Sequence, residues 1–66
     1  MYTRRVWYIR ASYNGFQFPL FLECTENHIQ EYMDTELPNF HFRYSGASDT
    51  EIENAKKMHL PIYMYK

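Results

Sequence analysis

Residues 7–22, WYIRASYNGFQFPLFL, decide the fold of this chain. Asn14 and Gly15 lie between two stretches whose side chains alternate in character. An Asn-Gly pair in this setting predicts a β-hairpin, because a two-residue type I′ turn needs positive φ at both central residues. The short turn also sets the register, so we expect Trp7 to lie opposite Leu22 in the paired strands.

The predicted hairpin has two different faces, because successive side chains of a strand point to opposite sides of the sheet. One face is apolar throughout and carries Trp7, Ile9, Ala11, Tyr13, Phe16, Phe18, Leu20 and Leu22. The other face carries Arg4, Val6, Tyr8, Arg10, Ser12, Gln17, Pro19, Phe21 and Glu23. We therefore expect the face of Trp7 to form the core side of the sheet.

Pro19 restricts where the other strands can join. It opposes Arg10 at a position where its missing N–H would point away from the first strand. A proline at such a position is typical of an edge strand, so the second strand should be an edge near Pro19. With strands numbered in chain order, this predicts a sheet order of 2-1-3-4 or 2-1-4-3.

Two helices and two strands are expected after the hairpin. The helices are predicted at residues 26–36 and 49–59, and the strands at 39–45 and 61–66. Thr25 is a good N-cap, and Ser48 with Glu51 forms a capping box. The inward-facing residues are expected to be Ile29, Tyr32, Met33 and Leu37 in the first helix, and Ile52, Ala55 and Met58 or His59 in the second.

These elements predict an α+β fold, a two-layer ββαβαβ sandwich with a four-stranded mixed sheet. We expect both helices on one face, against Trp7 and Leu22, because crossover connections are right-handed. The chain of 66 residues forms a single small domain, residues 1–66.

Composition favours a soluble cytoplasmic protein. Cys24 is the only cysteine, so no disulfide is expected, and no apolar stretch approaches the ~20 residues that span a bilayer. The N-terminal residues lack the apolar core of a signal peptide. The net charge of −1 gives no general attraction to nucleic acid or membranes.

The charges divide between strands and helices. All four arginines lie in predicted strands, and seven of the eight acids lie in predicted helices. We therefore expect a basic and aromatic open sheet face and an acidic helix layer, both suited to contacting a partner protein. The candidate contact residues are Arg4, Tyr8, Arg10, Phe21, His41 and Arg43 on the sheet, and Glu31, Asp34 and Glu36 on the helix.

Catalytic and metal sites have little support in the sequence, and no cofactor is expected. Cys24 and His28 are four residues apart, but Cys24 is expected on the core face and no acid is placed to orient His28. The histidines and the cysteine lack metal-binding spacing, and no Gly-rich phosphate loop is present. A non-enzymatic binding protein is the leading hypothesis.

Two further interactions stay open. The arginines and rings of the sheet face are also compatible with single-stranded nucleic acid, although the domain lacks the net positive charge and the motifs of known sheet-face RNA binders. The strand near Ile62–Tyr65 is short and apolar, so its edge is a candidate for dimerisation by strand pairing.

Residues 7–42 resemble small phage-encoded inhibitors of host machinery, in particular inhibitors of bacterial RNA polymerase. The resemblance includes the hairpin led by Trp7, Pro19 in its second strand, the helix start at Glu23–Thr25 and the return to a strand at Pro38–Phe40. It implies a small protein that docks on and blocks a larger host protein or nucleoprotein machine. It implies no particular contact residue, and this chain has a further helix and strand.

Overall fold

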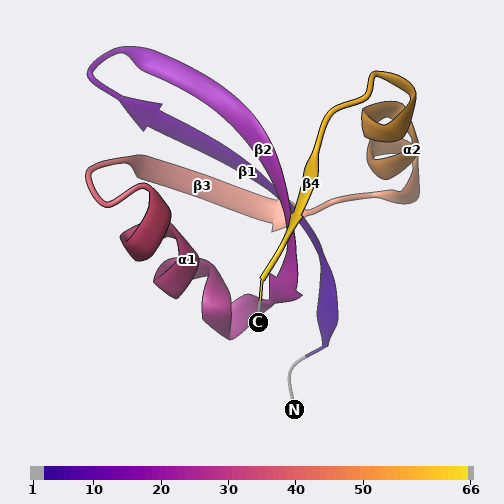
Figure 1. Ribbon diagram of the computed structural model, residues 1–66, viewed down its shortest axis with the longest axis horizontal. Helices are drawn as coiled ribbons and strands as arrows, with labels where there is room; N and C mark the ends of the chain where they lie inside the picture. The colour runs from indigo at the N-terminus through magenta and orange to yellow at the C-terminus, as the bar shows by residue number, and fades with distance from the viewer. Residues whose placement is uncertain (1–2, 66) are drawn as a thin grey trace.

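The structure, a computed structural model, describes residues 3–65. Its elements are β1 (Arg4–Tyr13), β2 (Phe16–Thr25), a 3-10 helix (Glu26–His28), α1 (Ile29–Glu36), β3 (His41–Gly46), α2 (Asp49–Lys57) and β4 (Ile62–Met64). Figure 1 shows this α+β fold, and the predicted mixed sheet of four strands with two helices is confirmed. The expected end of the last strand at residue 66 lies outside the described residues.

The hairpin forms with the predicted turn and register. Asn14 and Gly15 have φ values of 51° and 85°, as a type I′ turn requires. Trp7 lies opposite Leu22, and Arg10 lies opposite Pro19. The two long strands form the centre of the sheet.

The predicted strand order is wrong. The observed order is β3-β1-β2-β4, so β2 is internal, and β4 runs parallel to it. However, β4 pairs only with Phe21–Glu23, and Pro19 lies outside that pairing. The missing N–H of Pro19 is therefore tolerated because β4 is short, not because the whole of β2 is an edge.

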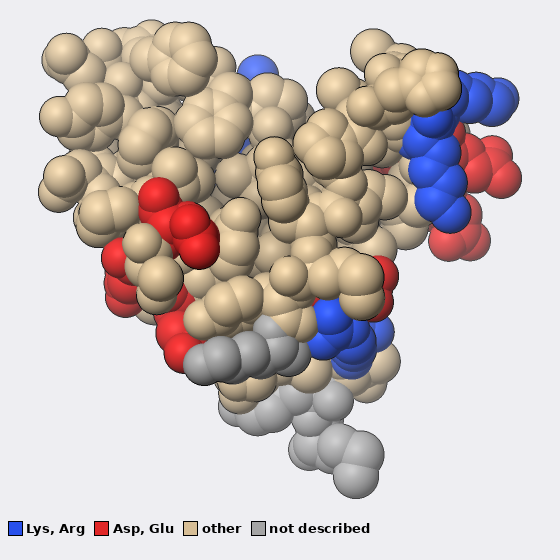
Figure 2. All heavy atoms as spheres, in the orientation of Figure 1, with Lys and Arg blue, Asp and Glu red and all other residues tan. Residues whose placement is uncertain are grey.

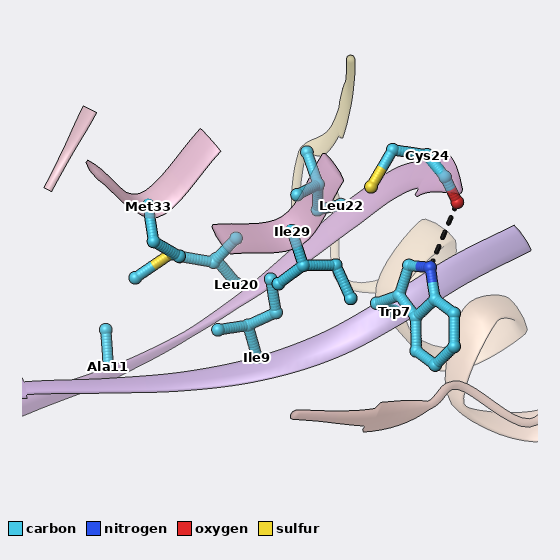
Figure 3. Close-up of a cluster of buried hydrophobic side chains, with 8 residues drawn as sticks. All are labelled: Trp7, Ile9, Ala11, Leu20, Leu22, Cys24, Ile29 and Met33. Atoms are coloured by element: carbon cyan, nitrogen blue, oxygen red, sulfur yellow. Dashed lines mark hydrogen bonds between the residues drawn. The ribbon is translucent and has the colours of Figure 1, made fainter. Parts of the chain in front are cut away.

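The main core lies on the face that the hairpin register predicted. Its buried members are Trp7, Ile9, Ala11, Leu20, Leu22, Cys24, Ile29 and Met33. Figure 3 shows these side chains gathered between the strands and α1. The indole N–H of Trp7 donates a hydrogen bond of 3.0 Å to the carbonyl oxygen of Cys24, which anchors the ring at one end of the core. The predicted burial of Trp7 and the apolar stripe of the first helix are confirmed.

The expectation that both helices share one face is wrong. Ile52 and Ala55 of α2 pack with Val6, Tyr8 and Phe21, whose side chains point away from the main core. The strand order explains this placement. The connection from β2 to β3 and the connection from β3 to β4 join parallel strands but cross the sheet in opposite directions. Connections of the same hand then place α1 and α2 on opposite faces.

The C-terminal end of the second helix also differs from expectation. The capping box between Ser48 and Glu51 is present and begins α2 as predicted. The helix ends at Lys57 rather than near His59, and Met58 and His59 are exposed rather than inward-facing. His59 has a positive φ of 59°, which turns the chain out of the helix.

Candidate functional site

A groove opens where β2 and β4 separate. The parallel register pairs Ile62 with Phe21, and continuing it backward would bring Pro61 beside Leu20 and Leu60 beside Pro19. Neither proline has an N–H with which to extend the pairing. The two segments diverge in Figure 1, and a groove of about 370 Å³ lies between them.

The lining of the groove is largely apolar. It consists of Phe18, Pro19, Leu20 and Phe21 from β2, Tyr32, Glu36 and Leu37 from α1 and its end, and Leu60, Pro61 and Tyr63 from the segment that enters β4. Leu60 and Tyr63 are 43% and 48% exposed, so the rim presents large apolar surfaces to solvent. Figure 2 shows this face hollowed between the hairpin and the segment that joins α2 to β4. Concave, mostly apolar sites with a few polar groups are typical of ligand and peptide binding.

Tyr32 and Glu36 supply the polar groups on the α1 side of the groove. Burial raises the pKa of Tyr32, and the nearby Glu36 and Tyr63 add to the increase. The hydroxyl of Tyr32 is protonated at neutral pH, as an ordinary phenol is, and is a hydrogen-bond donor. The ring of Tyr32 packs against Tyr65 with centroids 5.3 Å apart, which fixes its direction. The carboxylate of Glu36 is an acceptor at the same wall.

The predicted acidic residues lie together on α1. Glu31, Asp34 and Glu36 are exposed, and Figure 2 shows an acidic patch over this helix. Asp34 accepts a hydrogen bond of 2.8 Å from the side-chain amide of Gln30. Neither Asp34 nor Glu36 forms an ion pair within residues 3–65. Because Glu36 also lines the groove, negative charge continues from the helix surface to the groove wall.

Two of the predicted sheet residues are not on an open surface. Phe21 is only 7% exposed and Tyr8 is half-buried, because α2 covers this part of the sheet. Their rings contact each other with centroids 5.4 Å apart. The expectation of an open aromatic face is therefore wrong for this half of the sheet.

The predicted basic residues divide into two groups. Arg4 lies beside Glu23, with Nε 3.0 Å from a carboxylate oxygen, and it also donates to the Glu23 carbonyl oxygen. Arg10, His41 and Arg43 are exposed on the half of the sheet that α2 leaves uncovered. The structure therefore does not bring the six predicted sheet residues into one open surface.

Cys24 and His28 do not form a nucleophilic pair. The Nδ1 atom of His28 lies 2.8 Å from the hydroxyl oxygen of Thr25. Cys24 is buried, and burial raises its pKa although the positive charge of Arg4 partly opposes this. A buried, protonated thiol is a poor nucleophile. In the part of the chain that the structure describes, no cluster of three potential metal ligands occurs.

The sequence reasoning did not identify the groove residues Tyr32, Leu60 and Tyr63 as a binding site. The sequence evidence for this groove lies in the two prolines, because Pro19 and Pro61 each prevent strand pairing. This signal becomes informative only when β4 is known to lie beside β2, whereas the hairpin and Pro19 predict that β4 lies on the other side of the first strand.

Comparison with protein-family models, curated proteins and solved structures finds no match to this chain. The similarity to phage inhibitors of host machinery stays a hypothesis. Among the described residues, no helix is long and apolar enough to cross a membrane.

Proposed function

We propose that this chain is a non-enzymatic protein-binding module that takes an extended segment of a partner protein into the groove between β2 and β4. The segment would carry a large apolar side chain close to lysine or arginine. The observation that carries this proposal is an apolar groove with an acidic helix along one wall.

The apolar part of the contact would come from the rim. Leu60 and Tyr63 are the most exposed large apolar side chains of the lining. Exposed apolar surface at the rim of a groove is typical of an interaction site. Tyrosine is also among the residues in which binding energy concentrates.

The acidic side chains at the groove would favour a positively charged partner segment. The carboxylate of Glu36 lies at the groove, with Asp34 on the same helix, and neither forms an ion pair within the described chain. A basic residue of the partner placed beside them would complement this charge and accelerate association. An acidic segment would be repelled at the same place.

Docking of such a segment would occupy a surface that the partner otherwise uses, which is how a small binder blocks a larger protein. The alternative of single-stranded nucleic acid has weaker support, because base stacking needs exposed rings. Tyr8 and Phe21, the rings expected for that purpose, are covered by α2.

Selection from a library of random displayed peptides tests the proposal and needs no identified partner. Enriched peptides should combine an aliphatic or aromatic residue with lysine or arginine. Their binding should fall about tenfold or more with Tyr63→Ser or Glu36→Lys, because each change removes a contact worth about 1.4 kcal/mol or more. Met64→Ser is the matched control, since Met64 is exposed beside the groove without lining it.

Two results would contradict the proposal. One is the enrichment of acidic peptides. The other is binding that responds equally to Tyr63→Ser and to Met64→Ser, because the groove would then make no special contribution. Melting curves of each variant separate lost binding from lost folding.

A further inference from the structure

The face of the sheet opposite the main core is covered by α2 over only half of its length. The uncovered half presents two rows of side chains across β2, β1 and β3. The first row is Gln17, Ser12 and His41, and the second row is Pro19, Arg10 and Arg43. The next row toward the other end contains Phe21 and Tyr8, and there α2 covers the sheet. The uncovered rows lie on the side of the sheet opposite α1 and its acids.

Arg10 and Arg43 are direct neighbours on adjacent antiparallel strands. Side chains at directly opposite positions lie within about 5.5 Å at their Cβ atoms, and like charges there are destabilising. Neither arginine forms an ion pair within residues 3–65, where the Arg4–Glu23 pair is found instead. Of the acids on α2, Glu51 accepts a hydrogen bond in the capping box, and Asp49 and Glu53 pair with neither arginine. No ion pair within the described residues therefore offsets this repulsion.

The two arginines border a hollow of about 320 Å³ on this face. Its lining consists of Arg10, Ser12, Gln17, Phe42 and Arg43. Residues that carry two guanidinium groups, a hydroxyl and a side-chain amide thus border one space together with Phe42, and no carboxylate of the described residues lines it. His41 lies beside Ser12 in the first row and adds a further polar group at the edge.

We infer that this hollow is a binding site for a phosphate group with two negative charges, as inorganic phosphate or a small phosphomonoester. One arginine satisfies the two oxygens of a carboxylate with its paired donors. Two arginines, a hydroxyl and an amide provide more donors than a carboxylate can accept, and they suit the three terminal oxygens of a phosphomonoester. The bound dianion would also remove the repulsion between Arg10 and Arg43.

A small ligand fits the rest of the charge distribution better than a nucleic-acid strand does. Arg4 is paired with Glu23, and the guanidinium of Arg5 lies 5.2 Å from the centre of the Trp7 ring. Neither extends the Arg10–Arg43 pair into a track for successive phosphates. The net charge of the chain is −1, whereas binding to nucleic acid depends on a basic surface.

Titration of the ¹⁵N-labelled protein, followed by amide chemical shifts, tests the inference. Inorganic phosphate and phenyl phosphate should each give saturable shifts centred on Ser12, Arg10 and Arg43, while chloride at equal ionic strength should not. Arg10→Gln or Arg43→Gln should weaken phosphate binding about 10- to 100-fold, since a charged hydrogen-bonded contact is worth about 1.5–3 kcal/mol. Lys56→Gln is the control, because it removes an exposed positive charge from α2 instead.

Thermal stability gives a second readout that needs no assignment. Phosphate should raise the melting temperature of the unmodified protein, and the same phosphate concentration should raise that of Arg10→Gln much less. Shifts spread evenly over the surface, or equal responses of Arg10→Gln and Lys56→Gln, would overturn the inference. Tighter binding of a single-stranded oligonucleotide than of phenyl phosphate, with steep salt dependence, would overturn it in favour of a nucleic-acid surface.

Discussion

The ionisation of Cys24 and Tyr32 makes the folding stability of this protein depend on pH. Burial is the largest cause that raises the pKa of each group in the folded state. The neutral forms are therefore favoured by folding, and the stabilisation is complete below the ordinary pKa values. It is lost as pH rises above about 8.5 for the thiol and about 10 for the phenol.

We therefore expect the free energy of unfolding to decrease as pH rises from about 8.5 toward 11. Urea denaturation at a series of pH values measures the change. Cys24→Ala should remove the part of the decrease that begins first and leave the part near pH 10. An unfolding free energy that increases over this range would contradict the assignment of both shifts to burial.

Replacement by alanine should have different effects on stability at the two glycines. Gly15 has a φ of 85°, and a methyl group added there would meet no heavy atom within 4 Å, whereas one added at Gly46 would lie 2.6 Å from the Arg5 guanidinium. Gly15→Ala should cost about 1–2 kcal/mol, because only the backbone is strained. Gly46→Ala should cost less, because the flexible end of Arg5 can move aside. Chemical denaturation of both variants makes the comparison, and the reverse ranking would contradict it.

At the scale of elements, local sequence signals correctly predicted turns and helix starts. The pairing of strands that are distant in the sequence was not predicted correctly. The Asn14-Gly15 turn and the Ser48–Glu51 capping box depend on neighbouring residues, so their chemistry is visible in the sequence. The placement of β4 depends on a partner about forty residues away. Pro19 is compatible with an edge strand and equally with a short neighbour that stops before it. A local argument does not distinguish these two arrangements.

The C-terminal end of α2 was also not predicted from local signals, and its geometry can be tested by mutation. His59 donates its backbone N–H to the Lys56 carbonyl, and Leu60 donates to the Ala55 carbonyl, at 3.2 and 2.8 Å. This is a Schellman ending with His59 in the left-handed position, where glycine is favoured. His59→Gly should stabilise the domain by about 1 kcal/mol, and His59→Ala should not. Melting temperatures of the two variants check this, and a loss of stability in His59→Gly would show that the histidine side chain contributes an unrecognised contact.

For the whole molecule, the placement of the helices on opposite faces changed the expected surfaces. The sequence correctly indicated which residues are charged and which side of the hairpin is the core. It did not indicate that α2 would cover Tyr8 and Phe21 and leave Arg10 and Arg43 uncovered. That division follows from the strand order, and so does the groove beside Pro19. The binding surfaces therefore depend on the least local feature of the fold.

Pro19 contributes both to the groove and to the part of the β2 edge that β4 leaves unpaired, so its replacement should affect both. Pro19→Thr restores a backbone N–H on the side of β2 that faces away from β1. An edge with an added donor pairs more readily with another chain, and prolines on edges normally oppose this. We expect Pro19→Thr to self-associate at lower protein concentration than the unmodified protein, as measured by sedimentation velocity.

Pro38→Thr is the matched control, because Pro38 is exposed and lies between α1 and β3 rather than in the sheet. Self-association of both variants to the same degree would contradict a role for the β2 edge. Pro19→Thr should also bind selected groove peptides more weakly, because a second copy paired along β2 would occupy the same space. Self-association without lost peptide binding would place the new contact at the exposed edge of β4, near Tyr63 and Met64, instead.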